Sequence, residues 1–287
     1  MKSRRVVDLL ADGLPPVPCW IDPFCLPKRG IMLLAGEAKV AKSFFLLEIA
    51  RALSTGTQLF GNPFFRVTEQ CRVLMVEQEL GPWGFGQRVK KIFARHNPSA
   101  YANTFNYLSK EPDWRFDTPK GRDHIRETII DYRPNIVILD PISYFYSVDD
   151  TNASNVGDLF RQIEHMKQMG LTDEMAVLVS HHMKKPPVGK ANRDGYDPLD
   201  PYNIRGSEKW FSAPDTIVTC NRLKGGTKDR WYVDTRWKTR HGEEPPDVQF
   251  LVTPDDLTSQ VTFEKFLTAP PASTMQAAST TPARLKL

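Results

Sequence analysis

Residues 30–53 place a short apolar run, a loop and a helical pattern in direct succession, and this order constrains the fold more than any other part of the chain. The run "GIMLLAG" is short and ends in glycine, which is typical of a buried strand. After the loop, apolar residues recur at the spacing of one helix face: Leu46, Ile49, Ala50 and Leu53. The loop "GEAKVAKS" nearly matches the phosphate-binding pattern G-x-x-x-x-G-K-[ST], with Ala41 where a second glycine is usual. We therefore expect a strand, a phosphate-binding loop over residues 36–43, and a helix that begins near Ser43.

The rest of the chain repeats this alternation of strand and helix. Further apolar runs of strand length occupy three ranges, 71–79, 135–141 and 175–182. Helical patterns lie between them at 121–132 and 156–166. Strands of continuous apolar character that alternate with helices predict an α/β fold with a mostly parallel sheet covered on both faces. From about residue 216 the segments "TIVTCNR", "RWYVDTRWKTR" and "DVQFLVT" predict strands that pair antiparallel at one end of the sheet.

Composition sets the domain bounds and the class of protein. We expect an irregular, proline-rich lead-in over 1–30 with a short helix near Val6–Leu10, one domain over 31–267, and a disordered tail over 268–287. The net charge of +4 permits contact with a polyanion without requiring it. The four cysteines have no C-x-x-C spacing, which favours reduced thiols of a cytoplasmic protein over a zinc site. No apolar run has the length of a membrane span, so we expect no contact with a membrane.

Three side chains support a nucleotide site. Lys42 would reach the β- and γ-phosphates of a nucleotide such as ATP, and Ser43 would hold Mg²⁺. The strand "IVILD" ends at Asp140, so this carboxylate lies at the ligand-binding edge of a parallel sheet, where it can orient the water shell of the metal. If Ala41 adopts a positive φ, the strain costs about 1–2 kcal/mol, and otherwise almost nothing. We expect the loop to work in either case.

Several motifs in one order resemble a known family. The stretch "WIDPFCLPKRGIMLLAGEAKVAKSFFLLEIA" resembles the start of RecA-like ATPases of the RepA type, the hexameric helicases of plasmids and phages. Residues of the family pattern are matched at Trp20, Gly30, Gly36, Lys39, Lys42 and Ser43, whereas Ala38 and Ala41 differ. The segments "RVLMVEQELG", "RPNIVILDPISYF", "VLVSHHMKK", "IRGSEKWFSAPDTIV" and "WKTRHG" continue the resemblance in the family's order, over about 20–250. It implies a three-layer RecA-like P-loop NTPase fold, ATP and Mg²⁺, single-stranded DNA as a partner, and a hexameric ring.

The resemblance also implies roles for individual residues. Glu79 would be the general base, with Glu77 as the second choice on the same face of its strand. His181 would sense the γ-phosphate, although His182 stays open because alternation puts the two rings on opposite faces. Arg205 would be the arginine finger that completes a neighbour's site.

A weaker candidate for that charge is the pair Lys238 and Arg240, with Arg240 favoured. The nucleotide itself would contact the whole loop: Gly36, Glu37, Ala38, Lys39, Val40, Ala41, Lys42, Ser43 and Phe44.

Single-stranded DNA would bind two loops. The first, at 142–155, offers Tyr144, Phe145 and Tyr146 for stacking on bases, although two aspartates in it oppose phosphates. The second, at 183–204, carries four cations: Lys184, Lys185, Lys190 and Arg193. A loop of this length inside a domain is usually functional, but three aspartates dilute its charge, so a merely solvated loop stays open.

Three functions are compatible with these features. The first is a ring-forming ATPase that moves on single-stranded DNA, a replicative helicase of a plasmid, phage or other mobile element. The second is a RecA-like DNA-binding ATPase that acts in recombination, annealing or regulation without unwinding. The third, a P-loop kinase of a small substrate, is disfavoured because no arginine-rich lid bounded by glycines follows the sheet.

Overall fold

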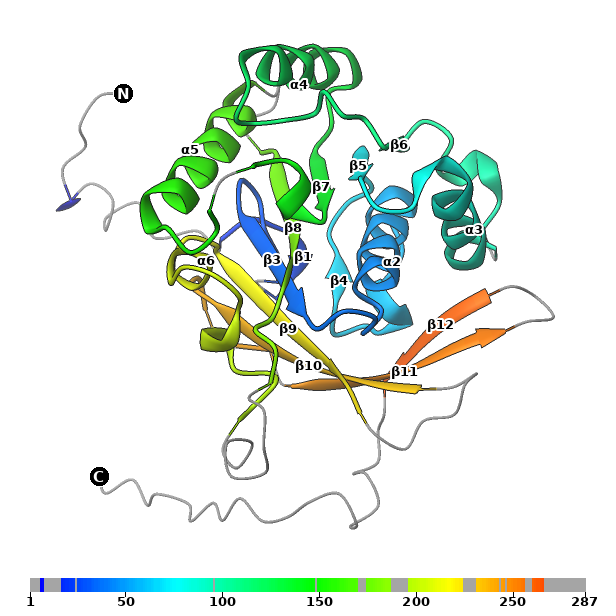
Figure 1. The fold of residues 1–287 in the computed structure, drawn as a ribbon. Coiled ribbons are helices and arrows are strands. Elements are labelled where there is room, and N and C mark those ends of the chain that lie inside the picture. The colour runs from blue at the N-terminus through cyan, green and yellow to red at the C-terminus, as the bar shows by residue number, and fades with distance from the viewer. Residues whose placement is uncertain are drawn as a thin grey trace.

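A nine-stranded sheet forms the centre of the described part of the molecule (Figure 1). The computed structural model describes residues 6–7, 17–23, 25–94, 96–147, 149–169, 174–186, 196–223, 231–242, 244–245, 247–255 and 260–265. The strand order is β12-β11-β10-β9-β3-β8-β7-β5-β6. Six neighbouring strands are parallel: β3 (Ile31–Gly36), β5 (Val73–Glu77), β6 (Phe105–Ser109), β7 (Ile136–Asp140), β8 (Ala176–His182) and β9 (Thr216–Arg222). Three antiparallel strands extend one edge: β10 (Trp231–Thr239), β11 (Val248–Asp255) and β12 (Gln260–Lys265).

Helices cover both faces of the parallel strands, because the strands are apolar on both sides. On one face, α2 (Lys42–Thr55) packs in one apolar cluster with Met32 and Leu34 of β3, and α3 (Gly81–Phe93) joins this cluster beside α2 and β6. On the other face, α4 (Pro119–Tyr132), α5 (Ala153–Met169) and the short α6 (Lys209–Ser212) pack on the alternate residues of the same strands. The predicted three-layer α/β architecture with a mostly parallel sheet is therefore confirmed.

The antiparallel strands close over α2 through an aromatic cluster. The ring of Phe45, on α2, lies 6.2 Å from that of Trp237 on β10 and 5.9 Å from that of Phe250 on β11. The ring of Phe60, in the 3-10 turn η1 (Leu59–Gly61), lies 4.1 Å from that of Phe250. Aromatic pairs at these separations stabilise packing beyond the area they bury. The cluster thus fixes the helix that follows the phosphate loop against the C-terminal strands.

Two expectations about the fold need correction. The segment "TIVTCNR" forms β9, which pairs parallel to β3, and the antiparallel pairing begins only with β10. The irregular lead-in is wrong for residues 19–27, where β1 (Cys19–Asp22) and β2 (Leu26–Pro27) form a small sheet with β4 (Arg66–Val67). Their side chains, with Trp20 only 2% exposed, join the core beside α2.

The termini, the cysteines and the length of the helices bear on the remaining sequence-based expectations. Val6–Val7 are helical, but the rest of the predicted N-terminal helix and the predicted tail at 268–287 lie outside the described residues. All four cysteines are buried thiols without a disulfide partner in the described structure. No helix among the described residues is long and apolar enough to cross a membrane.

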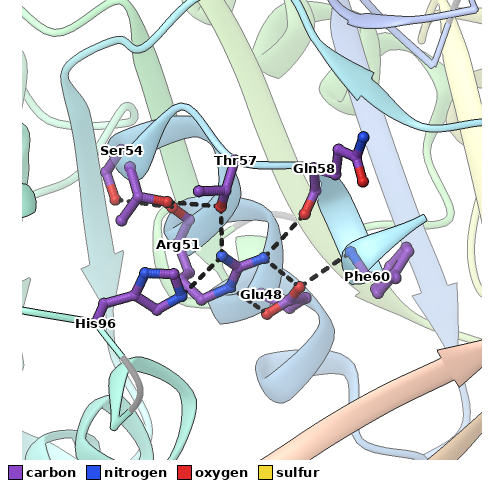
Figure 2. Close-up of polar contacts among 8 residues, drawn as sticks. Glu48, Arg51, Ser54, Thr57, Gln58, Phe60 and His96 are labelled. Atoms are coloured by element: carbon purple, nitrogen blue, oxygen red, sulfur yellow. Dashed lines mark hydrogen bonds and ion pairs between the residues drawn. The ribbon is translucent and has the colours of Figure 1, made fainter. Parts of the chain in front are cut away.

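A buried ion pair ties α2 to the segments that follow it (Figure 2). The Arg51 guanidinium donates to both carboxylate oxygens of Glu48, at 2.6 and 2.7 Å, and to the Thr57 hydroxyl at 2.6 Å. Glu48 also accepts a hydrogen bond from the Phe60 backbone N–H at 3.0 Å. Nη1 of Arg51 also lies 3.1 Å from Nε2 of His96. Because arginine has only donors, this histidine nitrogen accepts the hydrogen bond.

Candidate nucleotide-binding site

The loop between β3 and α2 has the backbone of an anion-binding site. Lys39 and Ala41 both have positive φ, of 67° and 77°, and the residue between them does not. Such alternation turns successive backbone N–H groups toward one concave side, and the first N–H groups of α2 point the same way. Ala41 therefore takes the strained alternative considered above, which costs about 1–2 kcal/mol relative to glycine.

Gly36 ends β3 at a point where no side chain fits. A Cβ atom at this position would lie 2.7 Å from the Cys220 carbonyl oxygen and 2.8 Å from a methyl carbon of Val40. Its nearest neighbour, at 2.6 Å, would be the Cys220 sulfur. The first glycine of the pattern is thus required by the close approach of β9 rather than by its dihedral angles.

Lys42 lies folded over the loop. Its ammonium group donates to the carbonyl oxygens of Gly36 and Glu37, each at 2.8 Å, and the residue is only 8% exposed. Burial lowers the pKa of this lysine, while the thiol of Cys220 and the carboxylates of Asp140 and Glu79 act in the opposite direction. An ammonium group has three donors, so Lys42 can keep both contacts and still donate to a phosphate.

A pocket of about 480 Å³ opens above this loop at the C-terminal edge of the parallel strands. That edge is where α/β proteins bind ligands, and the volume is in the range of small-molecule sites. Its lining comes from six separate segments: Ala38, Lys39, Ala41, Lys42, Ser43, Phe44, Glu79, Arg88, Asp140, Pro141, His182 and Arg222.

The predicted metal-binding residues meet in this pocket. Ser43 is the second residue of α2, and Asp140 ends β7, where it is 4% exposed. The Ser180 hydroxyl donates a hydrogen bond to the Asp140 carboxylate and so orients it. A hydroxyl and a carboxylate are hard oxygen ligands that fit Mg²⁺, which usually takes one or two carboxylates together with phosphate oxygens.

The two glutamates at the end of β5 have different environments. Glu77 is 2% exposed, and one of its carboxylate oxygens accepts from the backbone N–H groups of Glu79 and Leu80, at 2.6 and 2.5 Å. Its other oxygen accepts from the Ser109 hydroxyl at 3.1 Å. Glu77 thus holds the turn, whereas Glu79 lines the pocket. Partial desolvation, together with the Asp140 carboxylate, raises the pKa of Glu79, although Lys42 opposes the shift.

The two histidines at the end of β8 lie on opposite faces of the sheet, as predicted, but the structure reverses our preference between them. His182 pairs in register with Gly36, is half-buried and lines the nucleotide pocket. His181 is 1% exposed and packs on Trp210, with ring centres 4.2 Å apart, on the other face. The preference for His181 as the side chain that faces the nucleotide is therefore corrected to His182.

Comparison with known proteins agrees with this geometry. A family model described as an AAA domain matches residues 2–188, which is more than half of the chain. The chain belongs to the AAA domain family. Members of this family are P-loop ATPases, and the phosphate loop and the pocket described above fit this class. Comparison with curated protein sequences finds no match.

Two arginines that the sequence analysis missed line the pocket. Arg88 comes from α3, and its guanidinium carbon lies 5.3 Å from the centre of the Phe44 ring. Arg222 is the last residue of β9. The sequence did contain a signal for α3, because Gly-Pro opens the segment and Pro favours the first turn of a helix.

The two candidate arginine fingers lie outside the pocket. Arg205 lines a second cavity of about 370 Å³ on the opposite face, together with His181 and Trp210. Arg240 lies at the N-terminal edge of the sheet, because its backbone N–H donates to the carbonyl of Asp215, one residue before β9. Arg240 therefore does not line the pocket of its own chain, and its role as an arginine finger at a neighbour's site stays a prediction.

The first candidate DNA loop lines the second cavity through residues such as Ser143, Tyr146 and Asp150, whereas no described residue of the second loop does. In the first loop, Tyr144 is 51% exposed, but Phe145 is fully buried in the core, so the expectation that Phe145 stacks on bases is wrong. In the second loop, Lys184 and Lys185 are exposed, and the Lys184 ammonium donates to the Tyr202 carbonyl at 3.1 Å. Lys190 and Arg193 lie outside the described residues.

Proposed function

We propose that this AAA domain protein is an ATP-hydrolysing, ring-forming motor that acts on single-stranded DNA, a RepA-like replicative helicase of a plasmid, phage or other mobile element. The observation that carries the proposal is the convergence of four groups on one pocket, while the candidate arginine finger faces away from it. These groups are the phosphate loop, Asp140, Glu79 and His182. They are the parts that ATP hydrolysis requires.

The pocket residues divide the work of hydrolysis. The N–H groups of the loop and the Lys42 ammonium bind the β- and γ-phosphates. Ser43 and Asp140 would hold Mg²⁺, which would neutralise charge on the phosphates. Glu79 orients the attacking water and accepts its proton, and a raised pKa makes this carboxylate a better acceptor near neutral pH.

His182 reports the state of the γ-phosphate to the chain that follows it. Burial lowers the pKa of His182, and the charges of Lys42 and Arg205 lower it further. A neutral imidazole has one N–H donor, which can bond a phosphate oxygen. The loss of this bond after hydrolysis would release the start of the segment at 183–204, which begins one residue further on.

A ring explains why Arg205 points away from its own nucleotide pocket. The residue is 61% exposed in side-chain area, which leaves the guanidinium accessible to another molecule. In a head-to-tail ring, one surface of each copy meets a different surface of the next copy. Arg205 of one copy would thus reach the γ-phosphate bound by its neighbour, where an arginine contributes a factor of about 10³–10⁵ to turnover.

The proposal is tested by ATP turnover with and without single-stranded DNA, by the mass of the nucleotide-bound assembly, and by unwinding of a forked duplex. Lys42→Ala should abolish turnover, and wild-type turnover in this variant would refute the phosphate loop. Turnover stimulated by DNA without unwinding would instead support the RecA-like DNA-binding ATPase.

Mixing variants tests the ring itself. A Lys42→Ala copy still offers its arginine, and an Arg205→Ala copy still offers its pocket, so a mixture should restore turnover at the interfaces that pair intact halves. If mixed rings form and no mixture exceeds its parents, the charge comes from the same chain, and Arg88 and Arg222 are placed to supply it.

A further inference from the structure

Asp150 contacts Arg205 with its side chain, and its main chain contacts the residues that follow Arg205. Its carboxylate oxygen lies 3.3 Å from Nε of Arg205, and this is the only ion pair of Arg205 within the described part of the chain. Its carbonyl oxygen accepts hydrogen bonds from the Ser207 backbone N–H at 2.8 Å and from the Trp210 ring N–H at 3.4 Å. Asp150 lies between β7 and α5, so these contacts join the first candidate DNA loop to the segment that carries Arg205.

The close approach of Asp150 requires a glycine at the second position of the "RGS" segment. Gly206 has a φ of 98°, and a Cβ atom there would lie 2.4 Å from the Asp150 carbonyl oxygen. A side chain at this position would therefore displace the main chain of the loop. The absence of a side chain at Gly206 thus allows the Asp150 carbonyl to come close.

The backbone of Arg205 is fixed independently, from β8. Nε2 of His181 lies 2.9 Å from the Arg205 carbonyl oxygen, so this nitrogen carries the proton and donates. The Arg205 backbone N–H in turn donates to the His182 carbonyl at 3.0 Å. These two bonds fix the backbone position of Arg205. The direction of its side chain then depends on the ion pair with Asp150.

We propose that Asp150 is the positioning residue for Arg205, and that it makes the direction of this arginine depend on the conformation of the first DNA loop. This rests on the proposed function, in which Arg205 acts on the neighbour's nucleotide. The contact uses only Nε, so the terminal nitrogens of the guanidinium keep their four N–H donors for phosphate oxygens. DNA that orders the loop at 142–155 would thereby orient Arg205.

The test compares Asp150→Asn with Asp149→Asn in the full chain. Both changes raise the loop charge equally, but the Asp149 carboxylate accepts from the backbone N–H and hydroxyl of Thr151 and forms no ion pair with Arg205 in the described structure. Asp150→Asn keeps the carbonyl contacts, so the variant should fold. We expect it to lose roughly ten-fold in DNA-stimulated turnover with less than a two-fold change in the KM for ATP, since a finger acts in the transition state.

A double variant shows whether Asp150 acts through Arg205. In an Arg205→Ala background, Asp150→Asn should have no further effect, and Asp150→Glu in the otherwise wild-type chain should keep part of the stimulation. The inference is overturned if Asp150→Asn behaves like Asp149→Asn, if its effect persists without Arg205, or if it raises DNA-free turnover. By contrast, wild-type turnover in Arg205→Ala alone would refute the proposed function.

Discussion

Replacing Arg51 by Met should destabilise the fold strongly, because it leaves a buried carboxylate without its counter-charge. The side chains of Arg51 and Glu48 are each 8% exposed. Without the guanidinium, the only other hydrogen bond of the Glu48 carboxylate in the described structure is that from the Phe60 N–H. Breaking a buried pair from one side costs about 3–5 kcal/mol. For a chain of this size we expect the melting temperature to fall by roughly 10 °C.

Two comparisons separate this effect from a general loss of charge. The surface pair of Arg66 and Asp22 has side chains that are 69% and 31% exposed, so Arg66→Met should cost about 0–1 kcal/mol. Adding Glu48→Gln to Arg51→Met removes the unpaired charge while an amide oxygen can still accept from Phe60, so the double variant should be more stable than Arg51→Met alone.

Urea unfolding followed by circular dichroism measures these differences, provided that the slope with urea is unchanged. The reasoning is refuted if Arg51→Met is as stable as Arg66→Met. It is refuted equally if the double variant is no more stable than the single one.

Three further perturbations test the pocket and the core. Ala41→Gly should relieve about 1–2 kcal/mol of strain and lose about 0.4–1 kcal/mol to the more flexible unfolded chain, so unfolding should show a small gain and turnover should persist; a large loss of turnover would reveal a contact of the methyl group. Glu79→Gln should bind ATP in calorimetry but lose about 10²–10⁴-fold in turnover, whereas Glu77→Gln should lower the melting temperature; the reverse pattern would shift the catalytic register by two residues. Burial lowers the pKa of His181 to about 4, and its Nδ1 has no hydrogen-bond partner in the described structure. From about pH 6.5 down to 4 the unfolded chain therefore takes up a proton that the folded chain does not, so stability should fall by up to about 3 kcal/mol; a urea midpoint in His181→Asn with the same pH dependence as wild type would contradict this.

The sequence predicted the parts of the fold whose local pattern is strong. The strands β3, β5, β7 and β8 are continuous apolar runs because helices cover both of their faces, and α2, α4 and α5 each keep one apolar face. The strand β6 was missed because it is at the edge of the sheet, where Asn106 and Tyr107 are exposed and the pattern is weak. The parallel direction of β9 was missed because strand direction depends on a partner that lies far away in the sequence.

The same limit applies to the site. The pattern of residues 36–43 placed Lys42 and Ser43 correctly at the start of a helix, because loop and helix are contiguous. Alternation showed that His181 and His182 face opposite sides, but only the register against β3 decides which of them faces the nucleotide. Arg88 reaches the pocket through the packing of α3 on α2, which no short pattern records.

The missing Cβ at Gly36 has a mechanical consequence. The loop can neither sink toward β9, because Cys220 already occupies that space, nor rise from it without opening a void beneath the phosphates. Cys220 is two residues before Arg222, at the end of the same strand. The loop predicted to hold the phosphates and the strand that carries this arginine are therefore packed directly on each other, so a tilt of β9 would shift the loop and the charge over the pocket at the same time.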